Sequence, residues 1–293
     1  MFYSIENKLL KVSVETLGAQ LKSVWSKRTE TEYLWQRSPE YWKGSAPNLF
    51  PYIGRNFGGS YFYGDEEYAM TIHGVAKTRE FKLVSRSATR LTFLLEEDET
   101  SLKEYPFRFR FYIVYELEGE KLKTTYQVEN TDEKTLIFAL GGHPGFNVPF
   151  GEQGVFEDYY LEFAEKSNVC QLTCSENKFM SGKRIPFALE EGVKLPLKHE
   201  LFDNDAIILG STCRRVHLKS KATSRYITVE YPDFKYLGIW QTATPDTPFV
   251  CIEPWSALPA TEGKKDVLEN KADMYRLPAG KSYETVWTIS INE

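Results

Sequence analysis

The stretch FRFRFYIVYELEGEKLKTTYQV, residues 107–128, decides the fold class of this chain of 293 residues. In its first arm every second residue from Phe107 to Leu117 is apolar, and the same spacing continues from Leu122 to Val128. A period of two places alternate side chains on one face of a β-strand, and Glu118-Gly119-Glu120 supplies a turn between the arms. The stretch therefore predicts an antiparallel hairpin with one buried face.

Short segments of the same kind follow one another along most of the chain. The other predicted strands are Leu9–Val14, Gln20–Trp25, Phe81–Val84, Arg90–Leu95, Thr135–Ala139, Tyr159–Phe163, Ala206–Leu209, Val216–Leu218, Tyr226–Tyr231, Leu237–Thr242, Phe249–Ile252 and Glu284–Ile291. Helical signal is limited to one turn near residues 98–103. This pattern predicts an all-β protein, a large sandwich. Apolar strands near both termini favour a single domain over residues 1–293, and we expect the long loops 35–57 and 146–156 to be functional.

Composition narrows the class of function. The net charge is -5, the pI is about 5.6, and no basic block of the kind that binds nucleic acid is present. No apolar run approaches the roughly 18 residues of a membrane span, and the N-terminus lacks the features of a signal peptide. The four cysteines form no Cys-x-x-Cys pair and are expected to be free thiols. We expect a cytoplasmic protein that acts on a small molecule, without nucleic acid or membrane partners.

One histidine follows the predicted buried strand 135–139 in a turn rich in glycine and proline. Pro144 restricts His143 to extended backbone, and Gly141, Gly142 and Gly145 allow main chain or a ligand to approach closely. A side chain held at the rim of a sheet in this way is suited to meeting a ligand.

A glutamate is placed in the same manner at the end of another apolar strand, 249–252. Pro254 holds Glu253 extended, as Pro144 holds His143. Partial desolvation of such a carboxylate raises its pKa towards the range of a general base. The local sequence is equally compatible with a solvated glutamate at a strand end.

Three further polar side chains lie beside apolar segments. Arg55 follows a proline-containing run and a glycine, His73 precedes a glycine, and Asp205 comes directly before a predicted strand. Taken singly, the arginine and the histidine fit structural roles better than functional ones. Asp203 fits a turn, whereas Asp205 is placed to reach the same rim as His143. The residues that would complete a calcium loop here are missing.

Several cofactor and nucleophile signatures are absent from the chain. We find no glycine-rich phosphate loop, Gly-x-Ser-x-Gly elbow, Cys–His nucleophile signature or His-Glu-x-x-His motif. Four tryptophans near the polar segments offer flat faces of the kind on which sugars stack, although core packing is their commoner use. They are Trp35, Trp42, Trp240 and Trp255. The residues favour cofactor-free acid/base chemistry on a small polar molecule.

Five segments together carry a family resemblance. They are Asn48–Arg55, Ile72–Gly74, Gly142–Phe146, Asp205–Ile208 and Cys251–Trp255, in that order. In them the chain resembles the aldose 1-epimerases, or galactose mutarotase-like proteins, and most of all the branch encoded beside lactose-utilisation genes. The resemblance covers nearly the whole chain. It implies a large antiparallel β-sandwich with the sugar in an open cleft on one sheet, and no cofactor or metal.

The resemblance also implies roles for individual residues. Glu253 would be the general base that takes the proton of O1, and a protonated His143 would be the general acid that gives one to the ring oxygen O5. Their mutual attraction would favour an ionised Glu253 and a charged His143. The implied sugar-binding residues are Arg55, His73 and Asp205, with Trp240 and Gln241 as weaker candidates for the floor of the cleft.

The sugar and some alternatives remain open at this stage. His143 and Glu253 stand in local contexts that differ from those of the longer galactose-specific members, so the resemblance does not fix the sugar. A phosphorylated hexose would need Lys77, Arg55 or Arg79 as phosphate ligands, although no concentrated basic pocket is evident. A retaining glycoside hydrolase using Glu253 and Asp205, or a sugar-binding protein without turnover, are the rival interpretations. The oligomeric state is expected to be a monomer or a homodimer.

Overall fold

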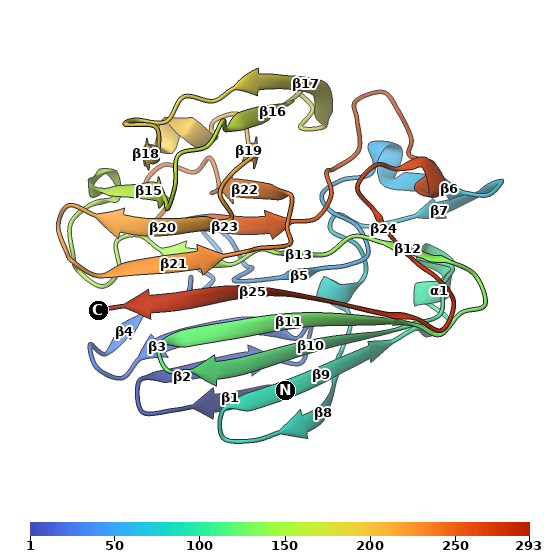
Figure 1. The fold of residues 1–293 in the computed structure, drawn as a ribbon, viewed down its shortest axis with the longest axis horizontal. Helices are drawn as coiled ribbons and strands as arrows, with labels where there is room; N and C mark the ends of the chain where they lie inside the picture. The colour runs from blue at the N-terminus through green and yellow to red at the C-terminus, as the bar shows by residue number, and fades with distance from the viewer.

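The computed structural model describes residues 1–293. Its regular secondary structure consists mostly of antiparallel strands, arranged in two large sheets and three small ones (Figure 1). The hairpin expected from residues 107–128 lies inside the larger sheet. Its arms are β10 (Phe109–Glu118) and β11 (Lys121–Asn130), paired from Phe109 opposite Asn130 to Glu118 opposite Lys121. The apolar face of the hairpin is buried, so the period of two was interpreted correctly.

The larger sheet has nine strands, and the C-terminal strand runs through its middle. Its order is β18 (Lys194–Pro196), β15 (Tyr159–Phe163), β20 (Arg215–Ser220), β21 (Tyr226–Glu230), β25 (Ser282–Asn292), β11, β10, β9 (Arg90–Glu96) and β8 (Lys82–Arg86). In Figure 1 the red β25 lies beside the green β11. The two ends of the chain are therefore parts of one structure.

The second large sheet has eight strands and carries the candidate site. Its order is β17 (Met180–Pro186), β16 (Cys170–Cys174), β19 (Ile207–Gly210), β22 (Tyr236–Trp240), β23 (Phe249–Trp255), β13 (Gly141–Gly142) and β5 (Asn48–Leu49), and β14 (Gly145–Asn147) also pairs with β23. Its central strand β23 is buried along its whole length.

Smaller elements complete the structure. The small sheets consist of β1 (Phe2–Glu6), β2 (Leu10–Glu15), β3 (Gln20–Ser26) and β4 (Thr31–Glu32); of β6 (Ser60–Tyr63) and β7 (Glu66–Ala69); and of β12 (Leu136–Phe138) and β24 (Tyr275–Leu277). The helical elements are α1 (Ser101–Glu104) and the 3-10 turns η1 (Phe57–Gly59), η2 (Ala76–Thr78), η3 (Phe156–Asp158), η4 (His199–Phe202) and η5 (Leu268–Asn270). None of these helices has the length and apolarity needed to cross a membrane.

The core lies between the two large sheets. A single cluster of 72 buried hydrophobic residues extends from Ile5 to Ile291. Phe50, which follows β5 of one sheet, stacks on Phe111 of β10 in the other with ring centroids 4.6 Å apart. Each fully buried side chain of this kind contributes roughly 1.5–3 kcal/mol of transfer free energy. The large antiparallel sandwich is thus confirmed. The single-domain organisation stays a prediction, and the continuous core is the observation in its favour.

The structure also contains strands that the sequence pattern did not indicate, among them β1, β16 and β17. In β17 every residue after Ser181 is exposed, so apolar and polar positions cannot alternate there. The expected strand 135–139 is real but short, and β12 pairs with β24 in a separate small sheet. The expected helical turn near residues 98–103 is present as α1.

Candidate active site

Strand register brings His143 and Glu253 together. β13 and β14 both pair with β23, with Gly141 opposite Trp255 and Gly145 opposite Cys251. Counting inward from both pairs places His143 opposite Glu253, and side chains directly opposite each other on one face lie close together. His143 Nε2 is 3.2 Å from Glu253 Oε2. The partner expected for His143 is therefore supplied by the neighbouring strand.

The glycines beside His143 make room for tryptophan rings. A Cβ on Gly142 would lie 2.8 Å from the ring of Trp287, and one on Gly145 would lie 3.1 Å from the ring of Trp42. Close approach was expected at these glycines, but of a ligand or main chain. The expectation holds at Gly141, where a Cβ would lie 3.0 Å from the carbonyl oxygen of Pro254. It is wrong at Gly142 and Gly145, where the nearest groups are indoles.

The His143–Glu253 pair is nearly inaccessible to solvent, with exposed fractions of 7% and 1%. Burial raises the pKa of Glu253 well above its ordinary value, and the charge of Asp205 adds to that rise. Burial lowers the pKa of His143 to about 3. Both shifts favour neutral side chains, so the unliganded pair holds one proton on the carboxyl. The sequence analysis expected a charged pair, with the single proton on His143. The structure also favours one proton on the pair, but places it on Glu253.

His73 is held in a single tautomer by the turn before it. The backbone N–H of Gly54 donates to His73 Nδ1 at 3.1 Å, so the proton of a neutral ring is on Nε2. Burial lowers the pKa of His73 well below its ordinary value, and a charge on His143, when that ring is protonated, acts in the same direction. The two imidazole rings are 5.4 Å apart between centroids. His73 is thus a neutral donor next to the acid/base pair.

Arg55 and Asp205 form a second pair in the same cavity. Arg55 NH1 lies 3.4 Å from Asp205 Oδ2, and the arginine side chain is 42% exposed. Asp205 has a φ of +81°, a backbone conformation that is strained for a residue other than glycine. The pair presents a donor fork and a carboxylate to whatever occupies the cavity.

A cavity of about 300 Å³ joins these side chains on the eight-stranded sheet. Its lining includes His143, Glu253, Arg55, His73, Asp205, Trp240, Trp255 and Trp42. The volume is at the lower end of the range for small-molecule sites. The long loop 35–57 contributes to the lining, as expected, whereas no residue of loop 146–156 does. The expectation that loop 146–156 is functional is therefore wrong for this cavity.

Gln241 does not line this cavity, although it was a candidate for its floor. It is buried, and its side-chain amide is 2.8 Å from His199 Nδ1. Trp240 does line the cavity, and successive residues of a strand point to opposite faces. The correction for Gln241 follows from that alternation.

The sequence analysis did not anticipate the contact between Trp42 and His143. The two rings stack with centroids 5.0 Å apart and an interplanar angle of 26°. The Trp35 indole N–H donates to the carbonyl oxygen of Trp42 at 2.8 Å and fixes the backbone there. Trp42 was noted only as one of four flat rings, and the glycine at 44 is the nearest local signal. A Cβ on Gly44 would lie 2.5 Å from the same indole.

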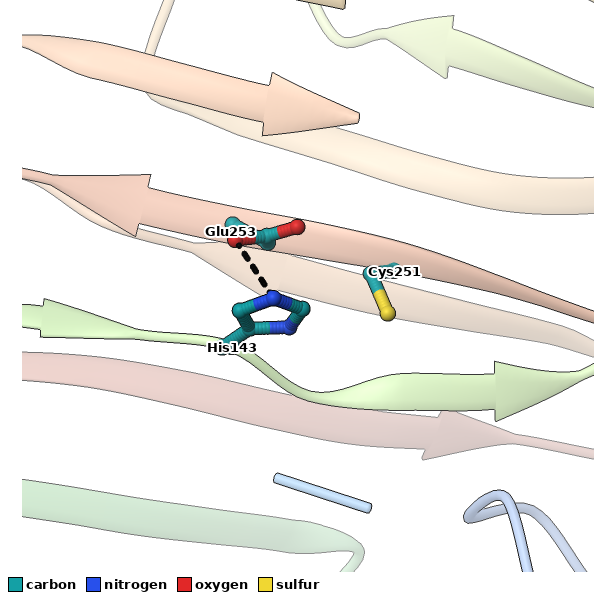
Figure 2. A group of neighbouring side chains, drawn as sticks. All are labelled: His143, Cys251 and Glu253. Carbon is teal, nitrogen blue, oxygen red and sulfur yellow. Dashed lines mark ion pairs between the residues drawn. The ribbon is translucent and has the colours of Figure 1, made fainter. Parts of the chain in front are cut away.

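One group of side chains in the structure has the composition of a metal site. Figure 2 shows Cys251 beside His143 and Glu253, and one ligand atom from each lies within 4.8 Å of the others. Burial raises the pKa of the Cys251 thiol well above its ordinary value, and the Glu253 charge adds to this. Because metals bind the thiolate, an ion at this group would have to displace a thiol proton that burial favours.

Comparisons with known proteins agree with this fold. The family model described as Aldose 1-epimerase matches residues 1–265. Protein LacX, chromosomal, of Lactococcus lactis subsp. lactis is 36% identical over 298 residues, covering 97% of this chain and 98% of that protein. The structure of a galactose mutarotase related enzyme from Lactobacillus acidophilus superposes with a TM-score of 0.94 and 31% identity, covering 100% of this chain and 98% of that one.

A galactose mutarotase-like protein from Lactobacillus casei ATCC 334 gives the same TM-score of 0.94, with 30% identity and 100% of both chains covered. The chain belongs to the aldose 1-epimerase family. Its fold is that of the galactose mutarotase-like proteins.

Proposed function

We propose that the protein is an aldose 1-epimerase, which interconverts the α and β anomers of an aldohexose. The observation that carries the proposal is the His143–Glu253 pair. His143 Nδ1 is buried without a hydrogen-bond partner, and Glu253 Oε2, also buried, lies 3.2 Å from His143 Nε2 without forming a hydrogen bond to it. Buried polar groups are normally satisfied, so an unsatisfied pair facing a cavity is suited to a polar ligand. Family membership supports the same assignment.

Ring opening needs one proton removed from O1 and one delivered to O5. Glu253 takes the O1 proton as the C1–O1 double bond forms, and His143 Nε2 gives a proton to O5 as the C1–O5 bond breaks. The open-chain aldehyde then rotates about C1–C2. The same two groups act in reverse on the other face and close the ring. Nothing is oxidised and no group leaves, so the reaction as written uses no cofactor or metal.

The single proton of the unliganded pair fits this cycle. Ring opening leaves a protonated Glu253 and a neutral His143, which is the state that burial favours. Binding of a closed sugar places the O1 hydroxyl on Glu253 as a hydrogen-bond donor, which favours the carboxylate. The shared proton then moves across the 3.2 Å gap to His143. The pair therefore supplies both partial reactions without taking a proton from solvent.

The remaining lining residues are proposed to hold the sugar. The Nε2–H of His73 donates a hydrogen bond to the sugar near its ring oxygen. Arg55 donates to sugar hydroxyls, and Asp205 accepts from them. Trp42, stacked on the His143 ring, and Trp240, which meets that ring edge to face, form the aromatic part of the cavity wall. We propose that these contacts place O1 over Glu253 and O5 over His143.

The hydrolase interpretation receives less support from this geometry. A retaining glycosidase works with two carboxyl groups on either side of the scissile bond. Glu253 instead contacts an imidazole, while Asp205 is paired with Arg55. The arrangement of a carboxyl with an imidazole matches the needs of ring opening.

Polarimetry on a freshly dissolved α-anomer tests the proposed function. The purified protein is expected to accelerate mutarotation of glucose or galactose above the buffer rate. Release of phenol from aryl glycosides would support the hydrolase, and sugar binding without acceleration would support a non-catalytic binding protein. The proposal fails if no aldohexose, neutral or phosphorylated, equilibrates faster in the presence of the protein.

A further inference from the structure

Lys77 is a half-buried cation in the cavity wall that has no partner within the protein. It lines the cavity, and burial is the sole influence that lowers the pKa of its ammonium group. Arg55, in contrast, is compensated by Asp205 at 3.4 Å. Removing an ammonium group from water without a counter-charge is unfavourable. A negatively charged ligand would supply the missing partner.

The backbone that carries Lys77 is held in place. Lys77 belongs to η2, and the N–H groups of Val75 and Ala76 both donate to the carbonyl oxygen of Phe50, at 2.9 and 3.1 Å. On the other side, a Cβ on Gly18 would lie only 3.0 Å from the carbonyl oxygen of Lys77. Packing on both sides fixes the backbone from which the Lys77 side chain enters the cavity.

The charge balance of the cavity is opposite to that of the chain. The chain has a formal net charge of -5, yet the cavity is lined by Lys77, Lys178 and Arg55 against Asp205 and Glu253. Burial raises the pKa of Glu253, which reduces the negative charge further. A cavity with excess positive charge in an acidic protein attracts anions and repels cations.

The proposed pose indicates which part of the sugar meets Lys77. In a pyranose, O5 is bonded to C1 on one side and to C5, which carries C6, on the other. In the proposed pose Glu253 lies at O1, next to C1, and His143 lies at O5. Side chains on the far side of His143 from Glu253 therefore face C5 and C6. Lys77 follows His73 by four residues on the segment that ends in η2, and the His73 ring lies 5.4 Å from that of His143 between centroids. Lys77 therefore lies on the histidine side of the cavity.

We propose that the preferred substrate is an aldohexose with an anionic group at C6, a phosphate or a carboxylate, bound by Lys77. The proposal rests on the proposed function, because it uses the pose set by Glu253 and His143. Lys178, an exposed residue of the same lining, adds positive charge to the cavity. Arg79 was also considered for this role but is engaged elsewhere, by Glu104 and Asp98.

Exchange NMR at anomeric equilibrium tests the proposal without a pure anomer. The catalysed exchange rate is measured for glucose and galactose, for their 6-phosphates and for the corresponding uronates, after subtraction of the buffer rate. We expect kcat/KM to be at least tenfold higher for one anionic series than for the neutral sugars. The phosphate and uronate arms show which anion is bound.

Lys77→Met should lower the ratio of anionic to neutral kcat/KM about tenfold or more. Lys82→Met, which removes an exposed charge on β8, should leave it unchanged.

The outcomes separate this proposal from the proposed function. Neutral and anionic sugars exchanging equally well, or a ratio unaffected by Lys77→Met, would overturn the anion subsite and leave the epimerase intact. Equal losses for both series would assign Lys77 to hydroxyl binding and would also overturn it. If titration calorimetry shows 6-phosphate binding that depends on Lys77, without exchange, the subsite stands and the epimerase fails. If neither binding nor exchange is observed, both the anion subsite and the epimerase are refuted.

Discussion

Two of the buried polar clusters in the sandwich differ in how completely their hydrogen bonds are made. In the first, the Asn48 amide donates to the carbonyl oxygens of Gly18 and Ala19 at 2.9 and 3.1 Å. The Tyr126 hydroxyl donates to Asn48 Oδ1 at 2.7 Å, and the Tyr115 hydroxyl donates to the Ala19 carbonyl at 2.7 Å. This cluster, which we call the amide–tyrosine cluster, needs nothing from outside the protein.

The second cluster is the His143–Glu253 pair. It is equally buried, but His143 Nδ1 and Glu253 Oε2 have no hydrogen-bond partner. An unsatisfied buried polar group destabilises a protein by about 1–3 kcal/mol, so such groups are retained where a ligand satisfies them. The contrast indicates that the amide–tyrosine cluster supports the fold and that the His143–Glu253 pair performs the chemistry.

The largest expected effect comes from removing either member of the pair. Glu253→Gln and His143→Asn should each lower kcat by about 10²–10⁴-fold, because each removes one proton-transfer group. Glutamine resembles the neutral carboxyl that burial favours, so the free energy of unfolding should change by less than about 1 kcal/mol. Polarimetry and urea denaturation measure the two quantities. A Glu253→Gln enzyme with undiminished kcat would show that the base has been misassigned.

A smaller loss is expected when the ring stacked on His143 is removed. Trp42→Ala should lower kcat/KM about tenfold, because the imidazole loses the indole that orients it and covers the cavity. Trp42→Phe keeps an aromatic face and serves as the matched control, with a loss of at most a few fold. If Trp42→Ala and Trp42→Phe behave alike, stacking does not position His143.

The amide–tyrosine cluster should respond in the opposite manner. Tyr126→Phe removes one hydroxyl that donates to Asn48 and should lower the free energy of unfolding by about 0.5–1.5 kcal/mol. Mutarotation rates should change less than threefold. Urea denaturation and polarimetry on the same preparation check both. A large catalytic loss with unchanged stability would erase the distinction between the clusters.

The weakest expected response is to pH. Catalysis requires one proton on the His143–Glu253 pair. A second proton binds only as the pH approaches the His143 pKa of about 3. The first proton is lost only above the raised pKa of Glu253. After subtraction of the buffer rate, kcat/KM should therefore vary less than about twofold between pH 5 and 7. A fall in rate below a midpoint near 6.5, as for a free imidazole, would contradict a shared single proton.

Much of the fold was predictable because its strands have one buried face. Residues 107–128 and β25 alternate clearly, whereas β17 is mostly exposed and leaves no pattern to find. The candidates Glu253 and His143 were indicated by prolines at strand ends. Their contact depends on the register of β13 and β14 against β23, which joins segments far apart in the chain. No local pattern encodes that register.

Other features of the site were beyond local patterns for different reasons. The stack of Trp42 on His143 and the unpartnered state of Lys77 depend on loops whose course follows from packing. Gln241 is the exception, since strand alternation alone would have placed it on the face opposite Trp240. The burial that makes the pair neutral also comes from tertiary structure, and the sequence analysis consequently expected a charged pair.

Exchange NMR on Glu253→Gln and Tyr126→Phe, compared with the unaltered protein at matched concentration, tests the central claim most directly. Our account predicts that Tyr126→Phe exchanges α and β anomers at nearly the rate of the unaltered protein, while Glu253→Gln falls to the buffer rate and remains folded. Exchange by Glu253→Gln at the rate of the unaltered protein would contradict the claim that the unsatisfied pair carries the chemistry.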